Sequence, residues 1–199
     1  MKKEENPMLK KAETSVEINP IIANRWSPRS FDKNKNLTQE QITQLLEAAR
    51  WAPSSMNEQP WRFLVANRNE NSTIFWQMFE CLAEGNQVWC KNVNTLILVT
   101  AYQKYSNGDF NASAQFDTGL AAENLILQAV SMGLAAHPMG GFDKSKLKEI
   151  LQLSDDYTLL AIIAVGYQDE AEKLEDILLI RREKAPRTRK QIKDLLLKN

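Results

Sequence analysis

Two short polar segments near the start of the chain carry residue types that suit a phosphorylated, ring-bearing ligand. The first, residues 25–31, holds Arg25 and Arg29, whose guanidinium forks match a phosphate or an electron-rich carbonyl. The second, residues 52–61, holds small hydroxyl and amide side chains in a turn where backbone N–H groups can also face a ligand. Taken singly, they are more simply interpreted as solvated arginines and a loop that ends a helix. Their occurrence together with a third, basic run at 181–190 favours a binding site.

The composition argues against several classes of function. The chain has 199 residues, the length of one domain, and its 43% hydrophobic and 25% charged content is that of a globular protein. Its 25 Lys and Arg balance 25 Asp and Glu, so no net field favours nucleic acid or an anionic membrane. No run approaches the ~18 apolar residues of a membrane helix, and the polar N-terminus is not a secretory signal. We therefore expect a cytoplasmic protein.

The metal-ligating and nucleophilic residue types are scarce. Cys81, Cys90 and His137 are the only cysteines and histidine, which is too few for a zinc site or a Ser-His-Asp arrangement. We expect no bound metal, reduced cysteines and a packed, structural His137.

Helical and strand periodicities alternate along the chain and predict the elements that position these residues. We expect helices over about 38–51, 72–84, 112–132, 143–153 and 174–189, and strands over about 61–66, 95–101, 134–137 and 158–167. The helix at 112–132 is apolar almost all round, which predicts burial in a core or between subunits. No Gly-x-Gly-x-x-Gly follows a strand, so the dinucleotide-binding fingerprint is absent. The pattern predicts a three-layer α+β domain over 18–199, with a small mixed sheet, preceded by a flexible polar arm at 1–17.

With these pieces in order, the chain resembles the FMN-dependent nitroreductase family over roughly residues 20–195. The motifs that carry the resemblance are Arg-x-Ser-x-Arg-x-Phe at 25–31, Pro-Ser-Ser-x-Asn-x-Gln-Pro-Trp at 53–61, the apolar helix 117–132, His-Pro-Met-Gly-Gly-Phe-Asp at 137–143, and Pro-Arg-Thr-Arg at 186–189. The resemblance implies an α/β/α fold with a mostly antiparallel sheet, in an intertwined homodimer whose C-terminal tail embraces the partner. It also implies FMN at the subunit interface and transfer of electrons from NADH or NADPH to a small organic acceptor, such as a nitroaromatic, quinone or enone.

Site residues follow from the resemblance position by position. Arg25 and Ser27 resemble the phosphate and ribityl contacts, Arg29 approaches the pyrimidine end of the flavin, and Arg187 and Arg189 close over the phosphate. The segment contributed by the opposite subunit is matched by Pro53, Ser54, Ser55 and Asn57. The flavin ring is matched by a polar contact from Asn86 and by a loop that passes its N5 edge, made of Pro138, Met139, Gly140 and Gly141.

Gly140 departs from the family pattern, because better-known members often carry a glutamate there. A backbone N–H can still donate to N5, but an acidic group over the ring is lost. The resemblance therefore does not determine which acceptors this chain takes. Met139 and Trp26 either fill part of that space or pack in the core, and both interpretations stay open.

Three alternatives to an NAD(P)H oxidoreductase remain at this point. Some relatives with this fold cleave halogen from aromatic rings or fragment the flavin itself. A protein that holds flavin without turnover is the third. No side chain is needed as a proton donor or nucleophile, so we expect no catalytic residue beyond those that bind the cofactor.

Overall fold

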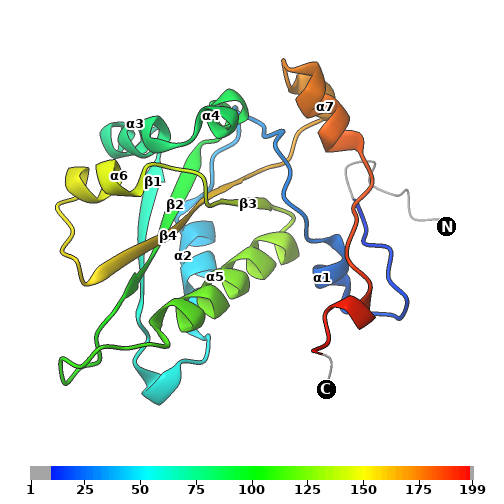
Figure 1. The fold of residues 1–199 in the computed structure, drawn as a ribbon. Coiled ribbons are helices and arrows are strands. Elements are labelled where there is room, and N and C mark those ends of the chain that lie inside the picture. Colours follow the sequence, from blue (N-terminus) through cyan, green and yellow to red (C-terminus); the bar gives the residue numbers. More distant parts are fainter. Residues whose placement is uncertain (1–9, 198–199) are drawn as a thin grey trace.

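Four apolar runs form the strands of one antiparallel sheet in the computed structural model, which describes residues 10–197 (Figure 1). The strands are β1 (Trp61–Asn67), β2 (Thr95–Tyr102), β3 (Ala135–Met139) and β4 (Tyr157–Gly166), in the order β1-β2-β4-β3. All three pairings are antiparallel. The central strands β2 and β4 are buried over most of their length, which explains their continuous apolar sequences. β3 lies at an edge, where Pro138 is tolerated although it lacks an N–H.

Helices cover both faces of the sheet. α2 (Gln39–Arg50) and α5 (Ala114–Ser131) pack on one face, and α3 (Ser72–Cys81), α4 (Glu84–Cys90) and α6 (Lys144–Ile150) pack on the other (Figure 1). Two hydrophobic clusters result, one around Leu45, Leu125 and Ile163, and the other around Phe75, Trp89 and Ile162. The α+β, three-layer α/β/α fold expected from the sequence is confirmed, but the predicted mixed sheet is wrong, because every pairing among these strands is antiparallel.

Local sequence signals set several helix ends as predicted. Thr38 and Gln41 form a reciprocal capping box at the start of α2. Gly133 takes a φ of +72° just after α5, the left-handed conformation that glycine adopts without steric strain. The Asp143 carboxylate caps α6 by accepting the N–H of Lys146.

The predicted helix over 72–84 is wrong at its C-terminal end. α3 ends at Cys81, and α4 is a separate helix that was not predicted from the sequence. The break is made by a distant segment: Ala83 N–H donates to the carbonyl of Gly141 at 2.9 Å, and Asp143 N–H donates to that of Cys81 at 2.7 Å. Tertiary contacts therefore override helix propensity at this point.

The predicted final helix over 174–189 is also too long. α7 runs only from Ile177 to Lys184, after the short 3₁₀ turn η2 (Ala171–Lys173). Pro186 disfavours helical backbone at the preceding residue, and Ala185 is extended. The chain then continues without helix to a last 3₁₀ turn, η3 (Ile192–Asp194).

The two ends of the described chain lie together around α1 (Pro20–Asn24), a short helix that was not predicted (Figure 1). Ala12 N–H donates to the carbonyl of Ala23 at 2.8 Å, and Lys10 Nζ to that of Arg182 at 3.5 Å. Residues 10–17 form no helix or strand, while 1–9 of the predicted arm lie outside the described residues. Within 10–197, none of the helices has both the length and the apolar character needed to cross a membrane.

Candidate functional site

The backbone of residues 28–30 is held from two sides. His137 Nδ1 lies 2.8 Å from the carbonyl oxygen of Pro28, and because a carbonyl only accepts, Nδ1 carries the proton. From the other side, Glu183 Oε1 accepts the N–H of Arg29 at 2.8 Å and that of Ser30 at 3.2 Å. The segment that carries the first arginine motif is therefore fixed to the edge strand β3 and to α7.

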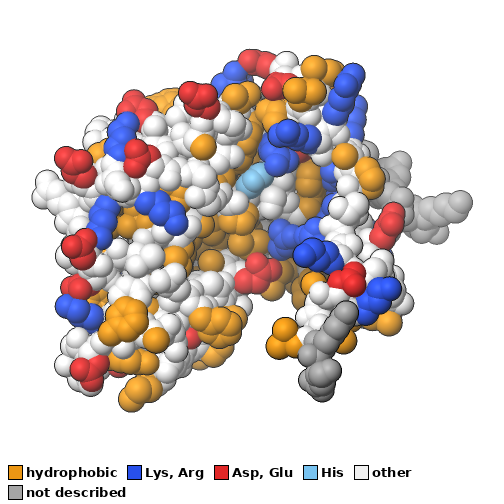
Figure 2. Space-filling model, in the orientation of Figure 1, with side chains coloured by type: hydrophobic (Ala, Val, Ile, Leu, Met, Phe, Trp, Pro, Cys, Tyr) orange, Lys and Arg blue, Asp and Glu red, His pale blue; other side chains and the backbone are white. Residues whose placement is uncertain are grey.

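The arginines predicted from opposite ends of the chain come together in space. We call the four of them the basic cluster: Arg25, Arg29, Arg187 and Arg189. Burial lowers the pKa of Arg187, and the positive charges of Arg25 and Arg189 lower it further, so these three lie within electrostatic range of one another. Arg29 joins them, because burial lowers the pKa of His137 and the charges of Arg29 and Arg25 both lower it further. Figure 2 shows the protein's only histidine on a hollowed, partly apolar face, with Lys and Arg side chains gathered beside it.

Arg187 is anchored and is not part of a frayed tail. Its Nη1 donates to the carbonyls of Lys10 and Ala23, each at 2.7 Å, so it fastens the N-terminal segment to α1. Arg189 is exposed, and its Nη1 donates to the carbonyl of the neighbouring Thr188 at 2.8 Å. The cluster therefore combines a fixed guanidinium with one whose side chain remains accessible.

His137 is the neutral, packed residue expected from the sequence. Its ring stacks on Trp89 with centroids 4.5 Å apart. Burial lowers its pKa to about 4, and the positive charges of Arg29 and Arg25 act in the same direction, whereas hydrogen bonds to the backbone of Pro28 and Ser27 oppose them. A neutral imidazole supports the backbone beside the cluster without adding to its charge.

Asn86 contacts the loop that follows β3, which begins at Gly140 because Pro138 and Met139 belong to the strand and not to the predicted loop. Asn86 Nδ2 donates to the carbonyl of Gly141 at 3.2 Å. Gly140 is exposed, and a Cβ added there would meet no atom within 4 Å, so the position is open to a side chain or a ligand. Met139 is only 2% exposed and packs in the core, which leaves its backbone but not its side chain for ligand contact.

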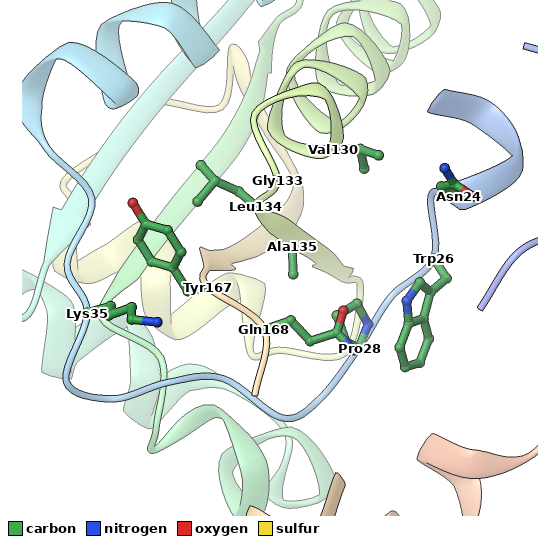
Figure 3. A pocket seen from close by; sticks show the side chains of 10 residues that line it. All are labelled: Asn24, Trp26, Pro28, Lys35, Val130, Gly133, Leu134, Ala135, Tyr167 and Gln168. Carbon is green, nitrogen blue, oxygen red and sulfur yellow. The ribbon is translucent and has the colours of Figure 1, made fainter. Parts of the chain in front are cut away.

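Trp26 lines two cavities, of about 260 Å³ and about 490 Å³. Figure 3 shows the smaller one, whose lining residues are Asn24, Trp26, Pro28, Lys35, Val130, Gly133, Leu134, Ala135, Tyr167 and Gln168. In the larger cavity, Lys10 Nζ lies 4.4 Å from the centre of the indole ring. Trp26 is thus partly buried but is not a member of either core cluster.

The second polar segment lies far from the basic cluster in the single chain. Its 3₁₀ turn η1 (Ser55–Asn57) sits at the end of the molecule remote from α1 and the C-terminal segment (Figure 1). Pro53 and Asn57 are exposed there, and Ser55 N–H donates to Asp117 Oδ2 at 3.0 Å. One chain therefore presents two separate groups of predicted site residues.

Two charged residues beside the cluster were not predicted. Glu183 lies in a run of basic residues, where a solvated carboxylate is the ordinary expectation, and only the structure shows it to be 4% exposed. Lys10 lies in the polar N-terminal arm. Burial is the main cause of its lowered pKa, and the positive charges of Arg187 and Arg29 lower it further. No local pattern in the sequence distinguishes either residue from surface charge.

Known proteins with this architecture identify the class. The model of the nitroreductase family matches residues 22–167 of this three-layer α+β fold. The chain is 30% identical to the protein DrgA of Synechocystis, over 75% of this chain and 83% of that one. It is 26% identical to the oxygen-insensitive NAD(P)H nitroreductase of Salmonella typhimurium, over 76% and 89%. A crystal structure described as an oxidoreductase containing FMN superimposes with a TM-score of 0.85 at 33% identity, covering 93% of each chain. This chain belongs to the nitroreductase family, as its motifs indicated.

Proposed function

We propose that this protein is an FMN-dependent oxidoreductase that transfers electrons from NAD(P)H to a small organic acceptor such as a nitroaromatic, a quinone or an enone. The observation that carries the proposal is the gathering of Arg25, Arg187 and Arg189 from opposite ends of the chain. Family membership supports it, as do similar proteins described as an NAD(P)H nitroreductase and as an oxidoreductase containing FMN.

The donor set fits the FMN phosphate. A phosphate monoester carries about −1.5 to −2 charges near neutral pH, and charge-assisted bonds to guanidinium groups are the strong class of hydrogen bond. In the proposed site, Arg25, Arg187 and Arg189 bind the phosphate, with Ser27 on the ribityl chain. Arg29 places positive charge at the pyrimidine end of the ring, which favours reduction.

The loop after β3 serves the other edge of the ring. The N–H groups of Gly140 and Gly141 are available at an exposed turn, with Asn86 beside them. When bound, FMN supplies the redox chemistry, accepting a hydride from NAD(P)H and passing electrons to the acceptor. The protein would bind FMN and orient the electron donor and the acceptor against it, and none of its side chains needs to act as an acid, base or nucleophile.

The proposed active unit is a homodimer with FMN at the subunit interface. Pro53, Ser54, Ser55 and Asn57 would reach the cofactor from the opposite subunit, since they lie far from the basic cluster of their own chain. α5 supports this arrangement, because its outward face carries Phe116, which is 71% exposed. The C-terminal tail embracing the partner belongs to the same proposal, and the cytoplasmic location stays a prediction.

FMN titration of the purified protein tests the phosphate site. Arg189→Ala removes an exposed guanidinium that donates to the carbonyl of the neighbouring Thr188, and we expect about 2 kcal/mol weaker binding, roughly a thirtyfold increase in Kd. Arg181→Ala is the matched control, because it removes the same charge from an exposed position on α7 outside the cluster. Equal FMN affinity in Arg189→Ala and the wild type would contradict the assignment.

Anaerobic mixing tests the electron transfer. The FMN-loaded protein is mixed with NADH and, separately, with NADPH, and the visible absorbance of the flavin is followed. Rapid bleaching by at least one donor is expected of a reductase. A protein that binds FMN and stays yellow with both would instead be a flavin holder.

A further inference from the structure

Glu183 is a buried carboxylate to which the proposed function gives no role. Although it lies on the charged helix α7, its side chain is only 4% exposed. Oε1 accepts two successive backbone N–H groups, those of Arg29 and Ser30, while Oε2 is buried with no hydrogen-bond partner among residues 10–197. Burying a carboxylate is unfavourable, so the backbone bonds and the nearby cations must offset that penalty.

The surroundings of Glu183 have opposing effects on the pKa of its carboxyl group. Burial raises the pKa of its carboxyl group, and the hydrogen bonds from Arg29 and Ser30 together with the charges of Arg29 and Lys10 oppose that rise. The cavity of about 490 Å³ that Glu183 lines also contains the exposed pair Glu172–Lys184. Glu172 therefore lines the same cavity as Glu183, but its carboxylate is exposed and pairs with Lys184.

The hydrogen bonds of Glu183 are part of a larger set that fixes the backbone of residues 28–30. Ser30 Oγ donates to the carbonyl of Glu170 at 2.6 Å, and Asp169 N–H donates to the carbonyl of Ser30 at 3.0 Å. On the other side, His137 holds the carbonyl of Pro28. Residues 28–30 are thus fixed by α7, by β3 and by the segment that follows β4.

We propose that Glu183 is a positioning residue: through Oε1 it fixes the Arg29–Ser30 backbone so that the N-terminal arginines face the C-terminal ones. It stands four residues before Arg187 on the same segment, so one side chain ties both halves of the basic cluster together. A preorganised cluster loses less conformational freedom when it takes up an anion. The inference rests on the proposed function only in using FMN as the probe of the cluster.

Two variants separate the position of the acceptor from its charge. Glu183→Gln keeps an oxygen acceptor at the same reach without the charge, and we expect its FMN Kd to stay within about threefold of the wild type. Glu183→Asp keeps the charge but is one methylene shorter, which withdraws the acceptor, and we expect about tenfold weaker FMN binding. Glu172→Asp is the matched control and should bind FMN as the wild type does.

Hydrogen–deuterium exchange of the FMN-free variants gives a readout that does not involve the cofactor. The peptide covering 25–31 should exchange faster in Glu183→Asp and at the wild-type rate in Glu183→Gln. Wild-type affinity and exchange in Glu183→Asp, or equal losses in both variants, would overturn the inference. A wild-type protein that fails to bind FMN would refute the proposed function, while the exchange result would still decide the role of Glu183.

Discussion

At the scale of single residues, His137 shows how the fold selects one protonation state. Its ring lies between Trp89 and the backbone of residues 27–28, with the cationic Arg25 and Arg29 close by. A proton added there has little solvent to stabilise it and two positive neighbours to oppose it. The pKa therefore falls from the ordinary 6.5 to about 4.

Acid should consequently destabilise the protein through this one residue. Between pH 6.5 and pH 4 the unfolded chain binds a proton at His137 that the folded chain does not, so the free energy of unfolding falls as the pH is lowered. The contribution lost by pH 4 is on the order of 3 kcal/mol. Urea unfolding at a series of pH values should show a steeper fall for the wild type than for His137→Gln. Parallel curves for the two proteins would contradict this account.

Arg187 has a structural role, and the proposed function gives its guanidinium a ligand as well. Two of its hydrogen bonds close the N-terminal segment onto α1, and the charges of Arg25 and Arg189 act on the same group. Replacing it would disturb both functions at once. Arg189 is therefore the better residue with which to measure phosphate binding alone.

At the scale of elements, the loop between α2 and β1 is the most strained part of the described chain. Met56, Asn57 and Gln59 have φ values of +53°, +57° and +50°, in the left-handed region. Glycine adopts this region freely, asparagine is tolerated there better than most residues, and other side chains are strained. Gln59 N–H donates to Ser54 Oγ at 3.0 Å, which helps to hold the turn. Such strain persists only where surrounding contacts enforce it, and it is frequent at ligand-binding segments.

Asp117 is the contact from α5 that fixes this loop. It is 4% exposed, and its Oδ2 accepts the N–H of Ser55 at 3.0 Å. We expect Asp117→Ala to lower the free energy of unfolding by about 2 kcal/mol, because a buried bond to a charged acceptor is lost. Asp117→Asn keeps an acceptor and should lose clearly less. Urea unfolding measures both, and an Asp117→Ala protein as stable as the wild type would show that the bond does not support the loop.

At the scale of the whole molecule, the proposed homodimer would bring the two separate groups of predicted site residues together. α5 is buried on the side that faces α2 and the sheet, but Phe116 on its other side is exposed. Phe110, which precedes α5 in the chain, is also exposed, as is Met56, the neighbour of the Ser55 that bonds to Asp117 of α5. A stable obligate interface buries on the order of 2,000–5,000 Å², and large apolar side chains are its usual contributors.

Phe116→Glu should therefore weaken dimerisation and FMN binding together. Removing an apolar anchor and adding a charge is expected to cost on the order of 2 kcal/mol, about thirtyfold in the dimer dissociation constant. Gln115→Glu adds the same charge one position earlier on α5 and serves as the control. Sedimentation velocity reports the oligomeric state, and a Phe116→Glu protein that remains a dimer would remove α5 from the interface.

The positions of most elements could be predicted from the sequence, because the signals are local. Apolar runs of strand length, the capping box at Thr38 and the glycine at position 133 act over a few residues, and they set the bounds of α2, α5 and the strands closely. The arginine motifs were likewise visible as sequence patterns, whereas the bond from Asn86 to the Gly141 carbonyl was found only in the structure.

The tertiary structure decided whatever depends on which distant segments meet. The pairing of residues 81–83 with 141–143 divides α3 from α4, and packing of α7 on residues 29–30 turns Glu183 from an ordinary surface charge into a buried acceptor. The tertiary structure also places the loop at 53–57 far from the basic cluster of the same chain. The hydrogen bonds that divide α3 from α4 and hold Glu183 join residues more than fifty positions apart in the chain, so no short window of sequence contains both partners.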